Sequence, residues 1–118
     1  MSDRVRWVEG NGTEILFCDY RELNGDEHAV AIEEQEEAIL SHKADFVRVV
    51  IDMYNSHMSD SSMQKAEESQ AKIKEQGIQV ALSVIGLGRI QRTLAQAFRK
   101  DIYFAKDFDD AKQWLDNN

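Results

Sequence analysis

The sequence predicts an α/β fold with a mixed sheet of about five strands flanked by about four helices, in the order ββαβαβαβα. Three observations lead to this prediction. An Asn-Gly pair at 11–12 separates two strand-like runs, which is the strongest short signal for an antiparallel hairpin. Farther along, apolar runs alternate with helix-periodic segments, as in parallel strands joined by crossover helices. Proline and linker composition are absent, so we expect a single domain over 1–118.

Two short strands open the predicted fold. Residues 4–8 alternate polar and apolar side chains, and residues 13–20 carry the apolar run Ile-Leu-Phe-Cys, so the two segments pair around the turn at 10–12. Residues 24–42 favour a helix, because apolar side chains recur at helical spacing on one side and glutamates gather on the other. The apolar side carries Ala29, Ile32, Ile39 and Leu40.

A buried strand and a capped helix come next. Residues 46–51 are apolar except for one arginine and end on Asp52, a pattern typical of a strand covered on both faces. Small hydroxyl side chains precede the following periodic segment, and Ser61 with Gln64 three residues later has the form of a capping box. We therefore expect a helix over about 61–76.

The last third of the chain predicts two further strands and two helices. Residues 78–86 are apolar enough for the interior of the sheet, and 102–104 form a short strand. Between them, a helix over 88–100 places four apolar side chains on one face. These side chains are Ile90, Leu94, Ala97 and Phe98. A last helix begins after Asp107, a preferred N-cap.

Several segments are similar to a known family. The apolar strand ending in Asp52, the short loop after it and the triplet 60–62, Asp-Ser-Ser, resemble STAS domains of the SpoIIAA type, the anti-sigma-factor antagonists. The Ala-containing strand at 80–86, the helix at 88–100 and the stretch 108–115 resemble a less characterised SpoIIAA-like branch of that family. The resemblance covers most of the chain from residue 13 onward.

The resemblance implies a STAS-like sheet and a regulatory role without catalysis or cofactor. Ser61 falls on the serine that a partner kinase phosphorylates in the sporulation regulators, so it is the phosphorylation candidate. Met63 and Gln64 stand where those regulators have Gly-Leu, which is a departure from their pattern. The resemblance also implies that Asp52 borders the partner site.

The order of the elements indicates the same region independently of the family. Crossover connections between parallel strands are right-handed in nearly every known case, so the loops after Asp52 and Gly86 share one edge of the sheet. Open α/β sheets bind ligands or partners at this edge. The candidate partner- or ligand-binding residues are Asp52, Tyr54, Asn55, His57, Ser59, Asp60, Ser61, Ser62, Gly86, Gly88, Arg89 and Arg92.

These features also have structural interpretations. Serines are preferred helix caps, and Asp52 is suited to accept loop N–H bonds in an Asx turn. The run Gly86-Leu87-Gly88 lacks the third glycine of a dinucleotide fingerprint, because Gln91 takes its place, so it predicts a tight strand-to-helix turn. The basic stretch of the chain, which could meet an acidic partner or a second copy, contains Arg89, Arg92, Arg99 and Lys100.

Metal and hydrolytic chemistry are not indicated. The three histidines lie in or beside separate elements without ligand spacing, so we predict no metal site. A triad of Ser61, His57 and Asp52 would come from a single loop that lacks a nucleophile elbow. Cys18 lies in a predicted strand, where we expect a small buried side chain and not a reactive thiol.

Composition and charge narrow the class of protein. The net charge is -8; residues 1–60 hold 14 acids and 5 bases, whereas residues 61–118 hold 8 acids and 9 bases. Such a surface disfavours nucleic acid and anionic membranes, which need a basic footprint. The N-terminus lacks an apolar signal region, and no apolar run is long enough to span a membrane. One cysteine fits a reducing compartment, so with the resemblance we expect a cytoplasmic bacterial protein without membrane insertion.

Three hypotheses on function remain open. The first is a regulatory module that binds a protein partner through Asp52, the loop over 53–61 and the next helix, with Ser61 phosphorylation as its candidate switch. The second is a small-ligand carrier or sensor for a lipid or nucleotide, because related STAS-like sheets hold such ligands between sheet and helices. Methionines typical of adaptable binding surfaces lie nearby, at Met53, Met58 and Met63. The third, an enzyme, lacks a converging acid, base and nucleophile. A homodimer stays open.

Overall fold

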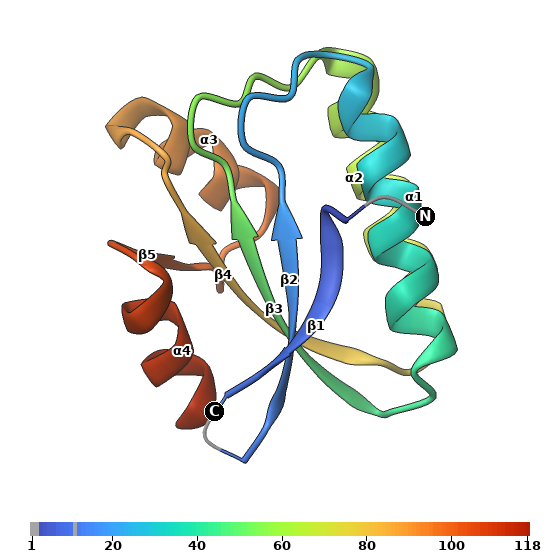
Figure 1. The fold of residues 1–118 in the computed structure, drawn as a ribbon. Helices are drawn as coiled ribbons and strands as arrows, with labels where there is room; N and C mark the ends of the chain where they lie inside the picture. Colours follow the sequence, from blue (N-terminus) through green and yellow to red (C-terminus); the bar gives the residue numbers. More distant parts are fainter. Residues whose placement is uncertain (1–2, 11) are drawn as a thin grey trace.

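The computed structural model describes residues 3–10 and 12–118, and its elements follow the order ββαβαβαβα (Figure 1). The strands are β1 (Val5–Glu9), β2 (Glu14–Asp19), β3 (Phe46–Asp52), β4 (Gln79–Ile85) and β5 (Tyr103–Ala105). The helices are α1 (Glu27–Ser41), α2 (Asp60–Glu75), α3 (Arg89–Phe98) and α4 (Phe108–Asp116). The predicted fold class and element order are confirmed.

The sheet has the strand order β1-β2-β3-β4-β5. The first two strands are antiparallel, as the hairpin signal predicted, and all later neighbours are parallel. In the turn between β1 and β2, the Gly10 N–H donates to the Thr13 carbonyl at 2.6 Å, and Gly12 has a positive φ of 85° that suits glycine. Asn11, which contributed to the hairpin signal, lies outside the described residues.

Three helices share one face of the sheet. Each new parallel strand is added on the same side of the previous one, so right-handed crossovers bring α1, α2 and α3 to the same face. There Leu16, Val49 and Leu82 pack with Ile32 and Ile39 of α1, among others. The strand order never reverses, so the sheet has no switch point, and the crevice that such a point opens at the carboxyl edge does not arise.

Helix α4 follows the last strand and covers the opposite face (Figure 1). Its Ala111 and Leu115 pack against Ile15, Val50 and Ile85. The helix begins as predicted, because the Asp107 side chain accepts a hydrogen bond from the Asp110 N–H at 2.8 Å.

The glutamate-rich face of α1 is partly paired with α2. Glu33 lies 3.2 Å from Lys65, and Glu36 lies 3.1 Å from Lys72. These contacts join the two neighbouring helices, so the face is more than a solvated surface.

Two findings bear on composition. Cys18 is fully buried and burial raises the pKa of its thiol, which confirms the prediction of a small core side chain. Within residues 3–10 and 12–118, no helix has both the length and the apolar character that crossing a bilayer requires.

Candidate functional site

The carboxyl ends of the parallel strands form one row at the top of the sheet. Asp19 at the end of β2 is in register with Asp52 at the end of β3, and Asp52 is in register with Ile85 of β4. The Asp52 carboxylate accepts a hydrogen bond from the Tyr54 N–H at 3.1 Å. Asp52 therefore has the turn-forming role that its position after a strand indicated.

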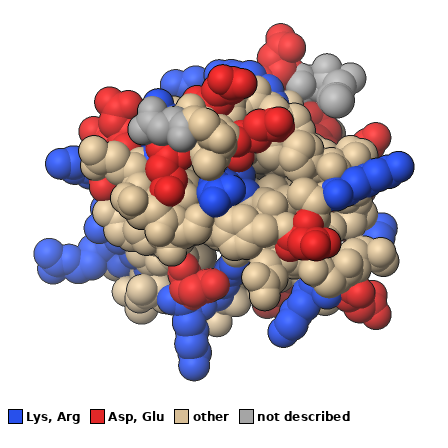
Figure 2. All heavy atoms as spheres, turned by 90° about the horizontal axis from the view of Figure 1, so that it is seen from below, with Lys and Arg blue, Asp and Glu red and all other residues tan. Residues whose placement is uncertain are grey.

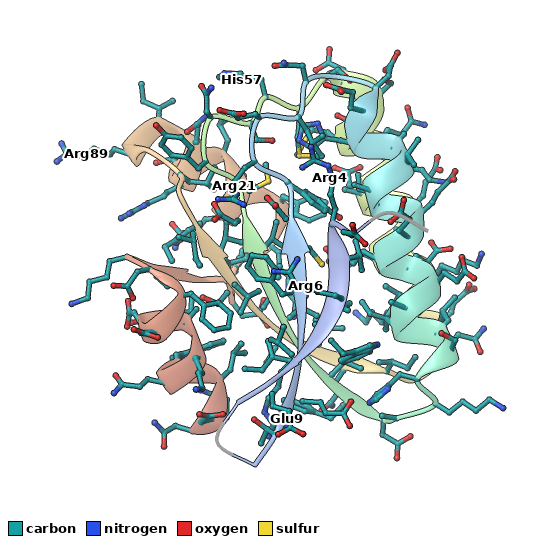
Figure 3. The ribbon with its side chains drawn as sticks, in the orientation of Figure 1. Arg4, Arg6, Glu9, Arg21, His57 and Arg89 are labelled. Carbon is teal, nitrogen blue, oxygen red and sulfur yellow. The ribbon has the colours of Figure 1, made fainter. Side chains whose placement is uncertain are left out.

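Arg21 belongs to this row, and the sequence interpretation missed it. Its guanidinium donates to both carboxylate oxygens of Asp19 at 2.9 and 3.0 Å and lies 3.9 Å from Asp52 (Figure 3). The hydrogen bonds from Arg21 lower the pKa of Asp19, so this carboxylate stays ionised well into acid. The sequence signal for this ion pair was an arginine two residues after the aspartate that ends the strand. The single guanidinium of Arg21 thus offsets one of the two negative charges at the strand ends.

Gly86 meets Asp52 and Tyr54 across the sheet edge, as the topology predicted. Gly86 has a φ of 88°, and a Cβ placed there would lie 2.6 Å from the Tyr54 backbone nitrogen and 3.2 Å from an Asp52 carboxylate oxygen. Only glycine fits this close approach. Arg89, in contrast, points away from the molecule at the far side of the edge from His57 (Figure 3).

Two of the other three predicted basic residues, Arg92 and Arg99, have internal partners. Arg92 donates to the Leu87 carbonyl at 3.1 Å and lies over the ring of Phe104. Arg99 follows α3 and donates to Asp101 at 2.6 Å and to the carbonyl of Val80. The stretch is therefore not a continuous free basic face.

The loop after β3 is held by the loop after β2. The His57 N–H donates to the Leu23 carbonyl at 3.0 Å, and the Gly25 N–H donates to the His57 carbonyl at 2.8 Å. Beneath them, the buried His28 ring contacts the buried Ser56 hydroxyl at 2.6 Å, and burial lowers the pKa of His28. The side chains of His57, Tyr54 and Asn55 are exposed on the outer side of this loop.

The cap of α2 differs from the prediction. Ser59 is the N-cap, and it forms a capping box with Ser62, whose hydroxyl accepts from the Ser59 N–H at 2.8 Å. The helix begins earlier than expected, at Asp60, so the N-cap is Ser59 and not Ser61. Gln64 instead donates to Glu68 within the helix at 3.3 Å.

This cap decides which serines are accessible. Ser62 is 1% exposed and cannot contact a partner, whereas Ser61 is exposed and donates to Asp26 at 3.2 Å. Among the described residues, no hydrogen bond joins any two of Ser61, His57 and Asp52, so a nucleophilic triad is not assembled. The same part of the chain contains no cluster of three or more His, Cys, Asp or Glu side chains that could hold a metal ion.

A second candidate site lies on the face of the sheet that α1, α2 and α3 cover. A groove of about 890 Å³ opens over β3 and β4, between α2 and α3. Ile51, Leu82 and Val84 contribute to its floor, and Ala66 and Ile73 line it from α2. Its upper end, next to the carboxyl edge, is lined by Tyr20, Met53, Met58, Met63 and Leu87.

Only one side of helix α3 faces this groove. Ala95 and Phe98 line the groove, but α3 has no buried residue. Ile90 is 78% exposed and Leu94 is 64% exposed, so part of the predicted apolar face of this helix stays exposed. The apolar arc of α3 is wider than the side that faces the sheet, and no described element beyond α3 covers the remaining flank.

No protein-family model matches the chain, and neither a curated protein nor a solved structure matches it. The fold is thus defined as a five-stranded mixed α/β sheet with three helices on one face and one on the other. Membership of the STAS family remains an inference from the sequence motifs.

Proposed function

We propose that this protein is a non-catalytic carrier or sensor that binds a small apolar ligand in the groove between the sheet, α2 and α3. The observation that carries the proposal is the groove itself. Its volume of about 890 Å³ falls within the range of about 300–1,000 Å³ that is usual for small-molecule sites. Apolar side chains make up most of its lining, and among the described residues its charged side chains are limited to Lys74, Arg99, Lys100 and Asp101.

The lining also favours an adaptable site. Met53, Met58 and Met63 lie together at the upper end of the groove, and unbranched thioether side chains reshape easily around different ligands. Helix α3 buries no residue of its own, so closing it over a ligand breaks little existing packing. A ligand would add the apolar contacts that α3 lacks.

The expected affinity is moderate. Burying about ten methylene groups contributes about 8 kcal/mol, and the cost of association takes away a large part of it. Because about 8 kcal/mol alone corresponds to about 1 μM, we expect dissociation constants weaker than this, between roughly micromolar and millimolar, for a single-chain amphiphile.

Blocking the groove tests this function. The fluorescence of N-phenyl-1-naphthylamine, a neutral apolar probe, should rise when it binds the wild-type protein. Ala95→Trp fills the groove from α3 and should abolish the rise. Ala97→Trp is the matched control, because Ala97 lies on the exposed side of the same helix and should leave binding unchanged. Equal probe binding by both variants, or none by the wild type, would rule out the groove as the site.

A second candidate function is regulatory protein binding at the carboxyl edge. The loops over 20–26 and 53–59 meet there and expose Tyr54, Asn55 and His57 around a rigid hydrogen-bonded frame. Ser61 lies beside them, exposed at the head of α2, where an added phosphate would meet free helix N–H groups but also the carboxylate of Asp26. Phosphorylation would therefore break the Ser61–Asp26 hydrogen bond and alter this surface.

Affinity capture from the native host tests the second candidate. A partner that wild-type protein retains and Ser61→Asp loses, at an unchanged melting temperature, would support the switch. Ser61→Ala is the control, and it should keep the partner. Retention of the same partner by Ser61→Asp would remove phosphorylation from the proposal.

A further inference from the structure

We propose that the ligand of the groove is an anionic amphiphile, whose charged head group lies near Lys74 and Lys100 while its apolar tail runs toward the methionines. This inference rests on the proposed ligand-binding function and adds the chemical class of the ligand. The inference follows from where α2 and α3 end, and from which charged side chains at that end of the groove already have an ion-pair partner.

The C-terminal ends of α2 and α3 converge on the first residues of β4. After α2 ends, the Ile78 N–H donates to the Ile73 carbonyl, so the chain turns directly into the strand. After α3 ends, Arg99 donates to the carbonyl of Val80, two residues farther along. Both helix ends are therefore placed over the start of β4, which forms the lower end of the groove.

Two unpaired positive charges line that end. Lys74 and Lys100 both border the groove, and neither forms an ion pair with any residue that the structure describes. The nearby Arg99 and Asp101 neutralise each other at 2.6 Å, and this ion pair lowers the pKa of Asp101. The polar end thus carries a net positive charge from the two lysines.

Lys74 differs from the other two lysines of α2 in having no ion pair with a described residue. Lys65 and Lys72 of the same helix are paired with glutamates of α1, whereas Lys74 on the groove side is not. The chain carries a net charge of -8, so an unpaired basic end on this groove favours an anionic ligand. Figure 2 shows the molecule from below, where basic and acidic side chains are scattered among uncharged ones.

The dimensions fit a single-chain amphiphile. From Met63 to Lys74 the groove follows α2 for about 16 Å, at a rise of about 1.5 Å per residue. Apolar Ala66 and Ile73 line this path with the uncharged Ser69 and Gln70 between them, whereas the charged side chains of the lining all lie at the lysine end. One end therefore suits a carboxylate or phosphate, and the rest suits an alkyl chain.

Matched amphiphiles and lysine variants test the inference. Dodecanoate and dodecanol, which differ only in the head group, are titrated into protein loaded with N-phenyl-1-naphthylamine. The dissociation constant of dodecanoate, measured by displacement of the probe, should be about 3- to 10-fold higher for Lys74→Gln/Lys100→Gln than for the wild type. This is the effect expected for the loss of two partly exposed ion pairs. Dodecanol displacement should not change. Lys106→Gln/Lys112→Gln removes the same charge away from the groove and should behave as wild type.

The outcomes separate this inference from the function on which it rests. If the probe and dodecanol bind but the affinity for dodecanoate is the same with and without the two lysines, the head-group assignment is overturned. The apolar groove then remains the proposed binding site. If neither probe nor amphiphile binds the wild type, both are overturned. Co-sedimentation with phosphatidylglycerol vesicles that depends on the two lysines, without displacement by dodecanoate, would overturn the free ligand in favour of a membrane surface.

Discussion

The seating of α3 predicts that Leu94→Ala is nearly neutral for stability. Full burial of a leucine side chain is worth about 1.5–3 kcal/mol. Leu94 is 64% exposed, so truncation should remove only about a third of that, or roughly 0.5–1 kcal/mol. The higher helix propensity of alanine offsets a few tenths of a kcal/mol. The matched substitution Leu115→Ala in α4, at a fully buried leucine, should cost about 2–5 kcal/mol.

Urea unfolding of the ligand-free protein, followed by far-ultraviolet circular dichroism, measures both substitutions. A loss for Leu94→Ala as large as that for Leu115→Ala would refute the reasoning, because α3 would then pack on the sheet by the flank that the structure exposes. The groove would be narrower in that case, and its ligand-binding role would lose its main support. Ile90→Ala, at 78% exposure, should give an even smaller loss and serves as an internal check.

Three further predictions concern the frame of the carboxyl edge. Because burial lowers the pKa of His28 below its ordinary value of 6.5, its contribution to stability is complete above pH 6.5 and is lost as the pH falls through the folded-state pKa. Just below pH 6.5, the free energy of unfolding measured in urea should rise with pH by up to about 1.4 kcal/mol per pH unit, and His28→Gln should remove this dependence. An unchanged pH dependence in the variant would contradict the assignment to His28. Gly86→Ala should lower the free energy of unfolding by about 2 kcal/mol or more. Gly77 also has a positive φ but no neighbour within 4 Å, so Gly77→Ala should cost only about 1 kcal/mol. Equal losses would contradict the close contact between Gly86 and Tyr54. Ser59→Ala should cost about 1 kcal/mol through loss of the α2 cap, and an equal cost for Ser61→Ala would contradict the observed capping box.

The fold could be predicted from local signals because each element carries its own. Alternating or continuous apolar runs marked the strands, and Asp107 marked the start of α4. The row formed by Asp52 and Gly86 was also predictable, since parallel strands place their carboxyl ends together. The cap of α2 was not, because several small hydroxyl residues in succession can each cap a helix and only packing selects Ser59.

The candidate site was only partly predictable. The residues after β3 were expected to bind a ligand by analogy with sheets whose strand order reverses, but this sheet adds its strands in one direction and has no such crevice. The three methionines were noticed in the sequence, and the structure places all of them on the groove. Arg21 was missed: its contact with Asp19 is local, but its approach to Asp52 depends on β2 and β3 being adjacent.

The sequence by itself determined the α/β class, the order of the elements, the antiparallel start of the sheet and the burial of residues such as Cys18. These properties follow from periodicity, turn residues and side-chain type within short windows. Only the tertiary structure decided that α1, α2 and α3 share a face, that Ile90 and Leu94 remain exposed, and that Lys74 and Lys100 border the same groove. The physical reason is that an amphipathic pattern specifies that a helix has an apolar side. Which part of that side is buried depends on neighbours that are distant in the sequence.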